Sequence, residues 1–183
     1  VKVMIFDTHA HYMDEAFAQD RDELLASMKD AGVGTIVEVG ASISSTKDAV
    51  ALSRQYDFVY GAVGVHPEHM TPETVEWLKE LTKEPKIVAV GEIGLDYYYE
   101  DPPRQVQKEW FIRQLEAAKE MKMPVIIHSR DAAQDTLEIM EEHCDWSQGG
   151  VIHCFSYSVE MARIYLKKGF YLGIGGVVTF KNG

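Results

Sequence analysis

Two histidines stand two positions apart near the start of the sequence, in the stretch FDTHAHY. Side chains at positions i and i+2 of an extended chain point to the same face, so His9 and His11 should direct both imidazoles toward one point. Imidazole nitrogens that converge in this way suit a divalent metal ion. The pair could also simply end an edge strand, so other residues must decide between the two interpretations.

A glutamate and further histidines follow at the ends of other apolar runs: His66 in GVHP, Glu92 in VGEIGLD, His128 in IIHSRD and His153 in VIHCFS. A carboxylate can bridge two ions where an imidazole cannot, which makes Glu92 the candidate bridge. Two ions about 3.5 to 4 Å apart can activate a shared water and stabilise a phosphoryl oxygen, so hydrolysis is the expected chemistry. No GxGxxG motif opens a helix, and nicotinamide or flavin chemistry is therefore not indicated.

Seven short apolar runs must position these side chains, and segments of helical character separate the runs. The runs are residues 3–6, 35–39, 58–65, 86–93, 123–128, 149–155 and 170–176. Continuously apolar strands are typical of a parallel sheet covered on both faces, and a repeat of roughly thirty residues fits a strand with its crossover helix. The pattern predicts an α/β fold, a TIM-type (β/α)8 barrel of which this sequence covers about seven strands. The carboxyl ends of all strands share one face of such a barrel, and the polar side chains should meet there.

Local signals predict where helices begin and end. Ser45 with Asp48 has the residue types of a capping box, and Thr71 before Pro72 is typical of a helix start. Helices are expected to stop at two glycines, Gly32 and Gly169.

Composition limits the class of protein and its partners. A chain of 183 residues with 46% hydrophobic residues can bury one core, and no linker divides it. The formal net charge of -11 argues against a long basic groove for nucleic acid, so an anionic substrate would have to be held locally by metal ions or by cations such as Arg130. The two cysteines lack a CxxC spacing, and no apolar segment reaches the length of a signal peptide or a membrane span. These features favour a soluble protein of the cytoplasm.

The motifs FDTHAH, GVHP, GEIGLDYY, HSRDA and HCFS, in this order, closely resemble the TatD family of metal-dependent deoxyribonucleases, within the amidohydrolase-like barrels. The resemblance runs from residue 3 to the last residue. It implies a two-metal nuclease that removes nucleotides from DNA ends, chiefly from the 3' end of single strands. Neither a membrane nor an obligate protein partner is indicated by the sequence. It also implies a set of metal ligands, which are His9, His11, Glu92, His128 and His153. Zn, Mn, Mg, Fe, Co and Ni are not distinguished by these ligands.

Other residues near the expected ligands are candidates for catalysis and substrate binding. By the resemblance, His66 and Arg130 match family positions near the scissile phosphate. Asp96 is expected in a loop over the same face, where it could orient a ligand or act as a base. Tyr97 begins a run of three tyrosines and is a candidate for stacking on a nucleic-acid base, although packing of the loop would explain the run as well.

The sequence departs from the family at its end. Family members typically continue through a further strand that ends in an acidic metal ligand, whereas this sequence stops at TFKNG. A closed barrel of this type needs eight strands and about 250 residues. We therefore expect a single barrel domain over residues 1–183 that lacks the C-terminal strand and helix, with open edges at the first and seventh strands.

Three functions are compatible with the sequence. The first is a two-metal phosphodiesterase acting on DNA ends. The second is a related metallohydrolase of a small ester or amide, since one barrel face serves many substrates. No lysine ends a strand where a carbamylated bridging lysine could stand, which weakens the second hypothesis. The third is an inactive barrel fragment, supported by the absent eighth strand.

Overall fold

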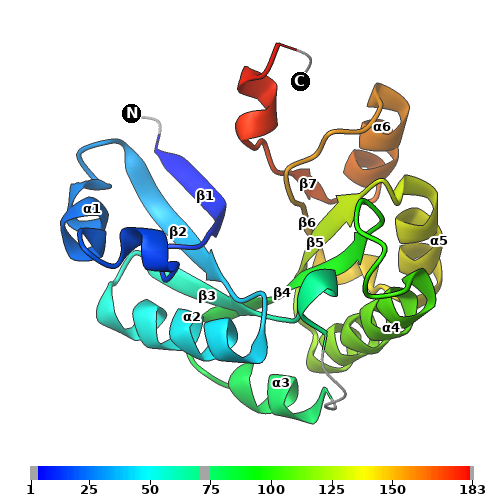
Figure 1. The fold of residues 1–183 in the computed structure, drawn as a ribbon, viewed down its shortest axis with the longest axis horizontal. Coiled ribbons are helices and arrows are strands. Elements are labelled where there is room, and N and C mark those ends of the chain that lie inside the picture. The colour runs from blue at the N-terminus through cyan, green and yellow to red at the C-terminus, as the bar shows by residue number, and fades with distance from the viewer. Residues whose placement is uncertain (1–3, 71–74, 182–183) are drawn as a thin grey trace.

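The computed structural model describes residues 4–70 and 75–181. Its centre is a sheet of seven parallel strands whose order in space is their order in the sequence. The strands are β1 (Ile5–Ala10), β2 (Val33–Val39), β3 (Val59–Val63), β4 (Ile87–Asp96), β5 (Val125–Arg130), β6 (Gly150–Ile152) and β7 (Tyr171–Leu172). The sheet curls into a half-barrel with the helices on its outer side (Figure 1). The α/β class and the TIM-type arrangement predicted from the sequence are confirmed.

Helices connect the successive strands. They are α1 (Arg21–Ser27), α2 (Ile43–Gln55), α3 (Glu76–Leu81), α4 (Arg104–Met121), α5 (Ala133–His143) and α6 (Val159–Lys167). Short 3-10 turns lie at Glu15–Phe17 (η1), Pro67–His69 (η2), Trp146–Gln148 (η3) and Gly176–Thr179 (η4). None of the helices in the described ranges combines the length and the apolar character that crossing a bilayer requires.

The largest hydrophobic cluster anchors β4 and β5 against the helices α4 and α5. Ile93 and Ile127 of the two strands are fully buried, as are Phe111 and Leu115 of α4 and Met140 of α5. Burial of each such side chain stabilises the fold by about 1.5 to 3 kcal/mol. The best-anchored pair of strands is thus the pair that carries Glu92 and His128.

A glycine allows β4 and β5 to approach closely beside these two residues. Gly94 pairs with His128 in the parallel ladder and has a φ of +147°. A Cβ atom at this position would lie 1.9 Å from the backbone oxygen of His128. Only a residue without a side chain fits, and the spacing of the two strands depends on it.

We expect Gly94→Ala to lower the free energy of unfolding by about 3 kcal/mol or more, because it adds overpacking to an unfavourable φ. The matched control is Gly149→Ala, where φ is +72° and no atom lies within 4 Å of the added Cβ. Urea denaturation of both variants measures the difference. Equal losses would show that the close approach of the strands contributes nothing.

Several local predictions need correction. The capping box consists of Ser42 and Ser45 instead of Ser45 and Asp48: the Ser42 side chain accepts the N–H of Ser45 (3.1 Å), and the Ser45 hydroxyl accepts the N–H of Ser42 (2.8 Å). The seventh strand is short, because only Tyr171 and Leu172 pair with β6 before the glycine-rich segment turns away.

The other predicted helix boundaries have mixed outcomes. Gly169 directly follows the C-cap of α6 with a φ of +87°, as expected for a residue that ends a helix. The prediction for Gly32 is wrong, because α1 already ends at Ser27 with Met28 as its cap, and Gly32 (φ +90°) instead closes the turn that leads into β2. The predicted helix start at Thr71 and Pro72 lies outside the described residues.

Within the described residues, β1 and β7 are the edges of the sheet, as expected (Figure 1). A cavity of about 690 Å³ has lining residues from both edges, including Phe6, His9, His153 and Leu172. Apolar side chains such as Phe6 and Ile174 are largely exposed along it. A single barrel domain over residues 1–183 that lacks the C-terminal strand and helix stays a prediction.

Candidate metal centre

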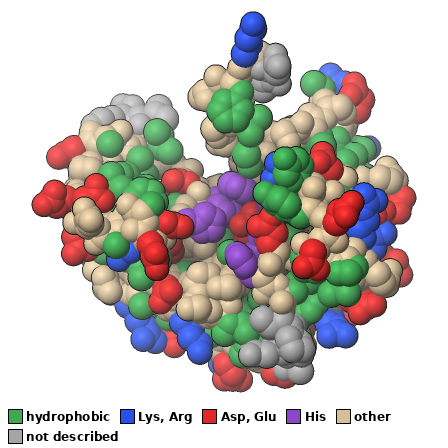
Figure 2. Space-filling model, viewed as in Figure 1, with side chains coloured by type: hydrophobic (Ala, Val, Ile, Leu, Met, Phe, Trp, Pro, Cys, Tyr) green, Lys and Arg blue, Asp and Glu red, His purple; other side chains and the backbone are tan. Residues whose placement is uncertain are grey.

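Histidines gather on the concave side of the sheet, around one buried glutamate. Figure 2 shows histidine side chains grouped at the centre of this face. One set of possible ligand atoms comes from His9, Glu92 and His153, and a second set comes from His66, Glu92 and His128, with all atoms of a set within 4.8 Å of one another. Glu92 is common to both sets, as a carboxylate that bridges two ions would be.

The residues lie in or directly after four strands of the sheet, β1, β4, β5 and β6, and in the segment after β3. His9 lies in β1, His11 directly follows it, and His153 directly follows β6. Glu92 and His128 do not end their strands, because β4 continues to Asp96 and β5 to Arg130. The sequence prediction that every candidate closes its strand is therefore wrong for these two, although the side chains still converge. His66 stands beyond β3, at the start of η2.

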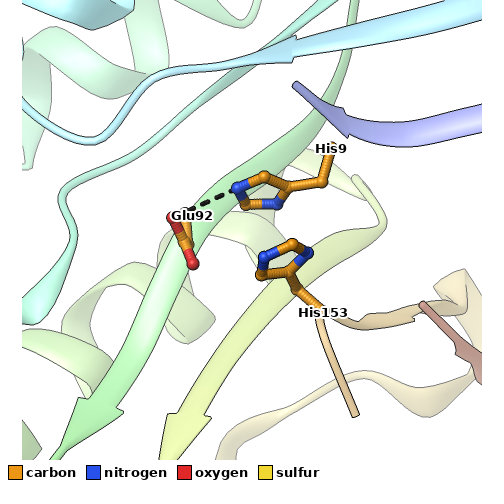
Figure 3. Close-up of side chains that lie close together, drawn as sticks. All are labelled: His9, Glu92 and His153. Carbon is orange, nitrogen blue, oxygen red and sulfur yellow. Dashed lines mark ion pairs between the residues drawn. The ribbon is translucent and has the colours of Figure 1, made fainter. Parts of the chain in front are cut away.

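His9, His11 and His153 form one side of the cluster. The Nε2 atoms of His9 and His11 are 3.0 Å apart, and they lie 3.3 and 3.9 Å from Oε2 of Glu92. His153 stacks on His9 with ring centroids 3.5 Å apart (Figure 3). Nitrogen and carboxylate atoms that crowd together in this way form a donor set suited to a divalent cation.

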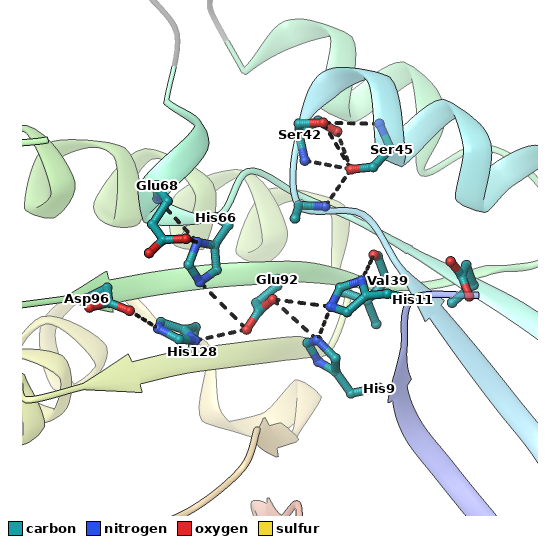
Figure 4. Close-up of polar contacts among 12 residues, drawn as sticks. His9, His11, Val39, Ser42, Ser45, His66, Glu68, Glu92, Asp96 and His128 are labelled. Atoms are coloured by element: carbon teal, nitrogen blue, oxygen red, sulfur yellow. Dashed lines mark hydrogen bonds and ion pairs between the residues drawn. The ribbon is translucent and has the colours of Figure 1, made fainter. Parts of the chain in front are cut away.

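A backbone carbonyl sets the tautomer of His11. The Nδ1–H of His11 donates to the carbonyl oxygen of Val39 (2.9 Å), so the neutral ring has its free lone pair on Nε2, which faces His9 and Glu92 (Figure 4). Burial and the neighbouring His9 lower the pKa of His11. The ring is therefore held neutral and oriented, as a metal ligand must be.

Asp96 orients His128 on the other side of the cluster. The Nδ1 of His128 lies 3.0 Å from Oε1 of Glu92, while its Nε2 lies 2.9 Å from Oδ2 of Asp96 (Figure 4). Asp96 is the last residue of β4 and is buried, so its predicted place in a loop is wrong. Its other oxygen accepts the N–H of Tyr98 (2.9 Å). With both oxygens engaged, the carboxylate is better suited to fix the His128 ring than to act as a base.

Burial sets the charges in the cluster. It lowers the pKa of His153 to about 3 and that of His66 to about 4. For Glu92, burial raises the pKa, but contacts with His128 and His9 outweigh burial and hold the pKa well below its usual range. Burial alone would lower the pKa of His128, but the neighbouring carboxylates of Glu92 and Asp96 outweigh burial and raise the pKa above its usual value. An ionised carboxylate among mostly neutral imidazoles fits a divalent ion.

We expect Asp96→Asn to weaken metal binding about 10- to 100-fold, because the ring of His128 loses its anionic acceptor. Calorimetric titration of the metal-free protein with Mn²⁺ or Zn²⁺ measures this. Glu141→Gln, which changes a surface ion pair with Lys168, is the control. Unchanged affinity in Asp96→Asn would rule out the orienting role.

The remaining predicted substrate residues lie at the carboxyl ends of β4 and β5: Tyr97 directly follows β4, and Arg130 is the last residue of β5. The hydroxyl of Tyr97 donates to Asp135 (2.6 Å), and the guanidinium of Arg104 lies 4.3 Å from the centre of its ring. Arg130 is exposed and its guanidinium lies 3.7 Å from the centre of the Tyr98 ring. A substrate contact of Tyr97 stays a prediction, and the neighbouring Tyr98 is more open to solvent.

Sequence reasoning missed two residues that hold the segment after His11. The buried carboxylate of Glu38 accepts the backbone N–H groups of Tyr12 (2.8 Å) and Met13 (3.0 Å). The guanidinium of Arg21 donates to the carbonyl oxygen of Tyr12 (2.6 Å). A lone acidic residue inside the apolar run TIVEV was the signal that could have indicated Glu38.

The fold and the shared-carboxylate centre define a class of protein, the metal-dependent hydrolases built on a TIM-type barrel. The family profile described as TatD related DNase matches residues 6–183. The chain belongs to the TatD family, as the sequence motifs indicated.

Individual relatives agree with this assignment. The chain is 44% identical over 182 residues to the uncharacterized metal-dependent hydrolase YabD of Bacillus subtilis, covering 98% of this chain and 71% of YabD. It is 34% identical over 177 residues to the 3'-5' ssDNA/RNA exonuclease TatD of Shigella flexneri, covering 95% of this chain and 68% of TatD. The crystal structure of the TatD homologue YjjV from Escherichia coli superposes with a TM-score of 0.90 at 32% identity, over 98% of this chain and 71% of YjjV.

Proposed function

We propose that this metal-dependent hydrolase cleaves phosphodiester bonds of DNA, removing nucleotides from the 3' ends of single strands with two divalent ions. The observation that carries the proposal is that the two oxygens of Glu92 face different histidines, Oε2 facing His9 and His11 and Oε1 facing His128. A bridging carboxylate with histidines on each side is the arrangement that two-metal phosphodiester hydrolysis needs. The relative TatD of Shigella flexneri, named as a 3'-5' ssDNA/RNA exonuclease, supports the substrate class.

The residues divide into two groups around the bridge. His9, His11 and His153 would hold one ion, and His128 would hold the other through the nitrogen that faces Glu92. When bound, the two ions would stabilise negative charge on a phosphoryl oxygen and lower the pKa of water. Asp96 and the carbonyl of Val39 keep the rings of His128 and His11 in place.

His66 is better suited to donate a hydrogen bond than to bind metal. Its Nδ1 accepts the backbone N–H of Glu68 (3.2 Å), so the neutral ring carries its proton on Nε2. That nitrogen faces the cluster, 3.9 Å from Oε1 of Glu92. A neutral N–H donor beside the bridge can stabilise the negative oxygens of the scissile phosphate. This proposed role agrees with the family position of His66.

The direct test is a substrate comparison with the purified, metal-loaded protein. Single-stranded DNA, duplex DNA, single-stranded RNA and small esters or amides are offered in turn with Mn²⁺, Mg²⁺ or Zn²⁺. We expect shortening of single-stranded DNA labelled at its 5' end, with release of mononucleotides. Faster turnover of an ester or amide would favour the related metallohydrolase. Turnover of no substrate with any metal, from protein that binds metal, would contradict the proposal.

Metal binding should stabilise the folded chain, because the ligands converge only when the strands are assembled. Free metal at one hundred times its dissociation constant would add about 2.7 kcal/mol to the free energy of unfolding. Thermal unfolding with metal and with excess EDTA measures the gain. The control variant His143→Ala, which removes a surface partner of Glu116, should be stabilised by metal to the same extent as the unchanged protein. If metal did not raise the unfolding temperature of the unchanged protein, the result would contradict a metal site.

A further inference from the structure

Two exposed tyrosines lie just beyond the buried end of β4. Tyr98 and Tyr99 are 58% and 48% exposed, and their rings meet edge to face with centroids 4.9 Å apart. The guanidinium of Arg130 lies 3.7 Å from the centre of the Tyr98 ring and 5.8 Å from that of Tyr99. Together these residues form an aromatic and cationic surface, here called the Tyr98–Arg130 platform.

The platform is fixed to the strands that carry the metal centre. The carboxylate of Asp96 accepts the N–H of Tyr98 (2.9 Å), and the carbonyl oxygen of Arg130 accepts the N–H of Tyr97 (2.9 Å). Asp96 and Arg130 are also register partners in the ladder between β4 and β5. Because Asp96 contacts both Tyr98 and the His128 ring, the platform has a defined position relative to the proposed ligands.

Arg130 has uncommitted hydrogen-bond donors. Across residues 4–70 and 75–181, no carboxylate pairs with its guanidinium and no side-chain hydrogen bond engages it. A guanidinium that stacks on an aromatic ring keeps its N–H edge available for the oxygens of a phosphate.

Arg130 of the platform and two of the proposed metal ligands line the same cavity. Its volume is about 310 Å³, and its lining includes His128, Arg130 and His153. A group bound in it could therefore contact Arg130 and the proposed metal ligands His128 and His153 together. An anionic ligand that also has a flat apolar part would satisfy both the cation and the exposed rings.

We propose that the Tyr98–Arg130 platform binds a nucleotide of the substrate adjacent to the scissile phosphate. Arg130 binds a phosphate oxygen of that nucleotide, and the exposed ring of Tyr98 stacks on its base, with Tyr99 packed edge to face against Tyr98. The inference rests on the proposed nuclease function and specifies which part of the chain recognises the nucleotide. Stacking on an aromatic side chain tolerates any base, so the platform selects a nucleobase without selecting a sequence.

The test compares two oligonucleotides, one with normal bases and one with abasic residues at the 3' end. Tyr98→Ala should raise KM about 5- to 100-fold for the normal oligonucleotide and less than about 2-fold for the abasic one, with kcat changing little. Tyr98→Phe should keep the normal KM, since the stacking face is retained. Tyr171→Ala, an exposed tyrosine on the edge strand β7, is the matched control. Thermal unfolding establishes that each variant is folded.

A binding measurement separates this proposal from the nuclease proposal. An oligonucleotide with 2-aminopurine at its 3' end should lose fluorescence when bound by the unchanged protein, and Tyr98→Ala should abolish this quenching. Quenching without turnover would contradict the nuclease function but would still support nucleotide binding by the Tyr98–Arg130 platform. Equal KM increases for normal and abasic ends, or quenching that persists in Tyr98→Ala, would overturn the platform.

Discussion

Replacing Glu92 with glutamine is expected to reduce kcat/KM on the order of a thousandfold, because it removes the ionised carboxylate that both ligand sets share. The buried carboxylate contacts His9 at 3.3 Å and His128 at 3.0 Å, and these contacts hold its pKa well below its usual range. Glutamine preserves the volume of the side chain but cannot supply the negative charge that two cations would share. The loss should therefore appear in metal content as well as in turnover.

Elemental analysis of the purified Glu92→Gln variant measures the first effect, and the rate of oligonucleotide shortening measures the second. Glu84→Gln, which removes one partner of a surface ion pair with Arg54, is the matched control and should keep both properties. Circular dichroism and thermal unfolding confirm that the variant is folded. If the Glu92 variant kept full activity and bound metal normally, the bridging role would be wrong.

The second large effect is expected for Glu38→Ala, because the Glu38 carboxylate holds the backbone of the segment that follows His11. Glu38 is only 2% exposed. Burial raises its pKa, although hydrogen bonds from the backbone of Met13 and Tyr12 act in the opposite direction. Alanine would leave those two partly buried N–H groups without their acceptor, at about 1 to 3 kcal/mol each. We expect the free energy of unfolding to fall by about 2 to 5 kcal/mol.

The same substitution should weaken metal binding, because the backbone beside His11 would no longer be held. Removing a group that orients a ligand typically costs about 10- to 100-fold in metal affinity. Urea denaturation and calorimetric metal titration measure the two effects separately. Glu23→Ala, a charge removal on the exposed surface of α1, controls for charge. A Glu38 variant that unfolds and binds metal like the Glu23 variant would exclude this positioning role.

The sequence by itself determined the class of fold and the identities of the converging side chains. Apolar runs separated by helical segments specify parallel strands, and parallel strands bring their carboxyl ends to one face. His9 and Glu92 could therefore be assigned to one centre before any coordinates were known. Their residue types also indicated a metal ion, since carboxylates and imidazoles are its usual ligands.

Tertiary structure alone decided how these side chains are held and which neighbours can act. The carbonyl of Val39 sets the tautomer of His11, and Asp96 aligns His128, across strands whose register the sequence does not state. The same register turns Tyr97 toward Asp135 and leaves Tyr98 exposed beside Arg130. The physical reason is that hydrogen bonds between distant strands depend on their relative shift, whereas periodicity in a sequence reports only the conformation within each strand.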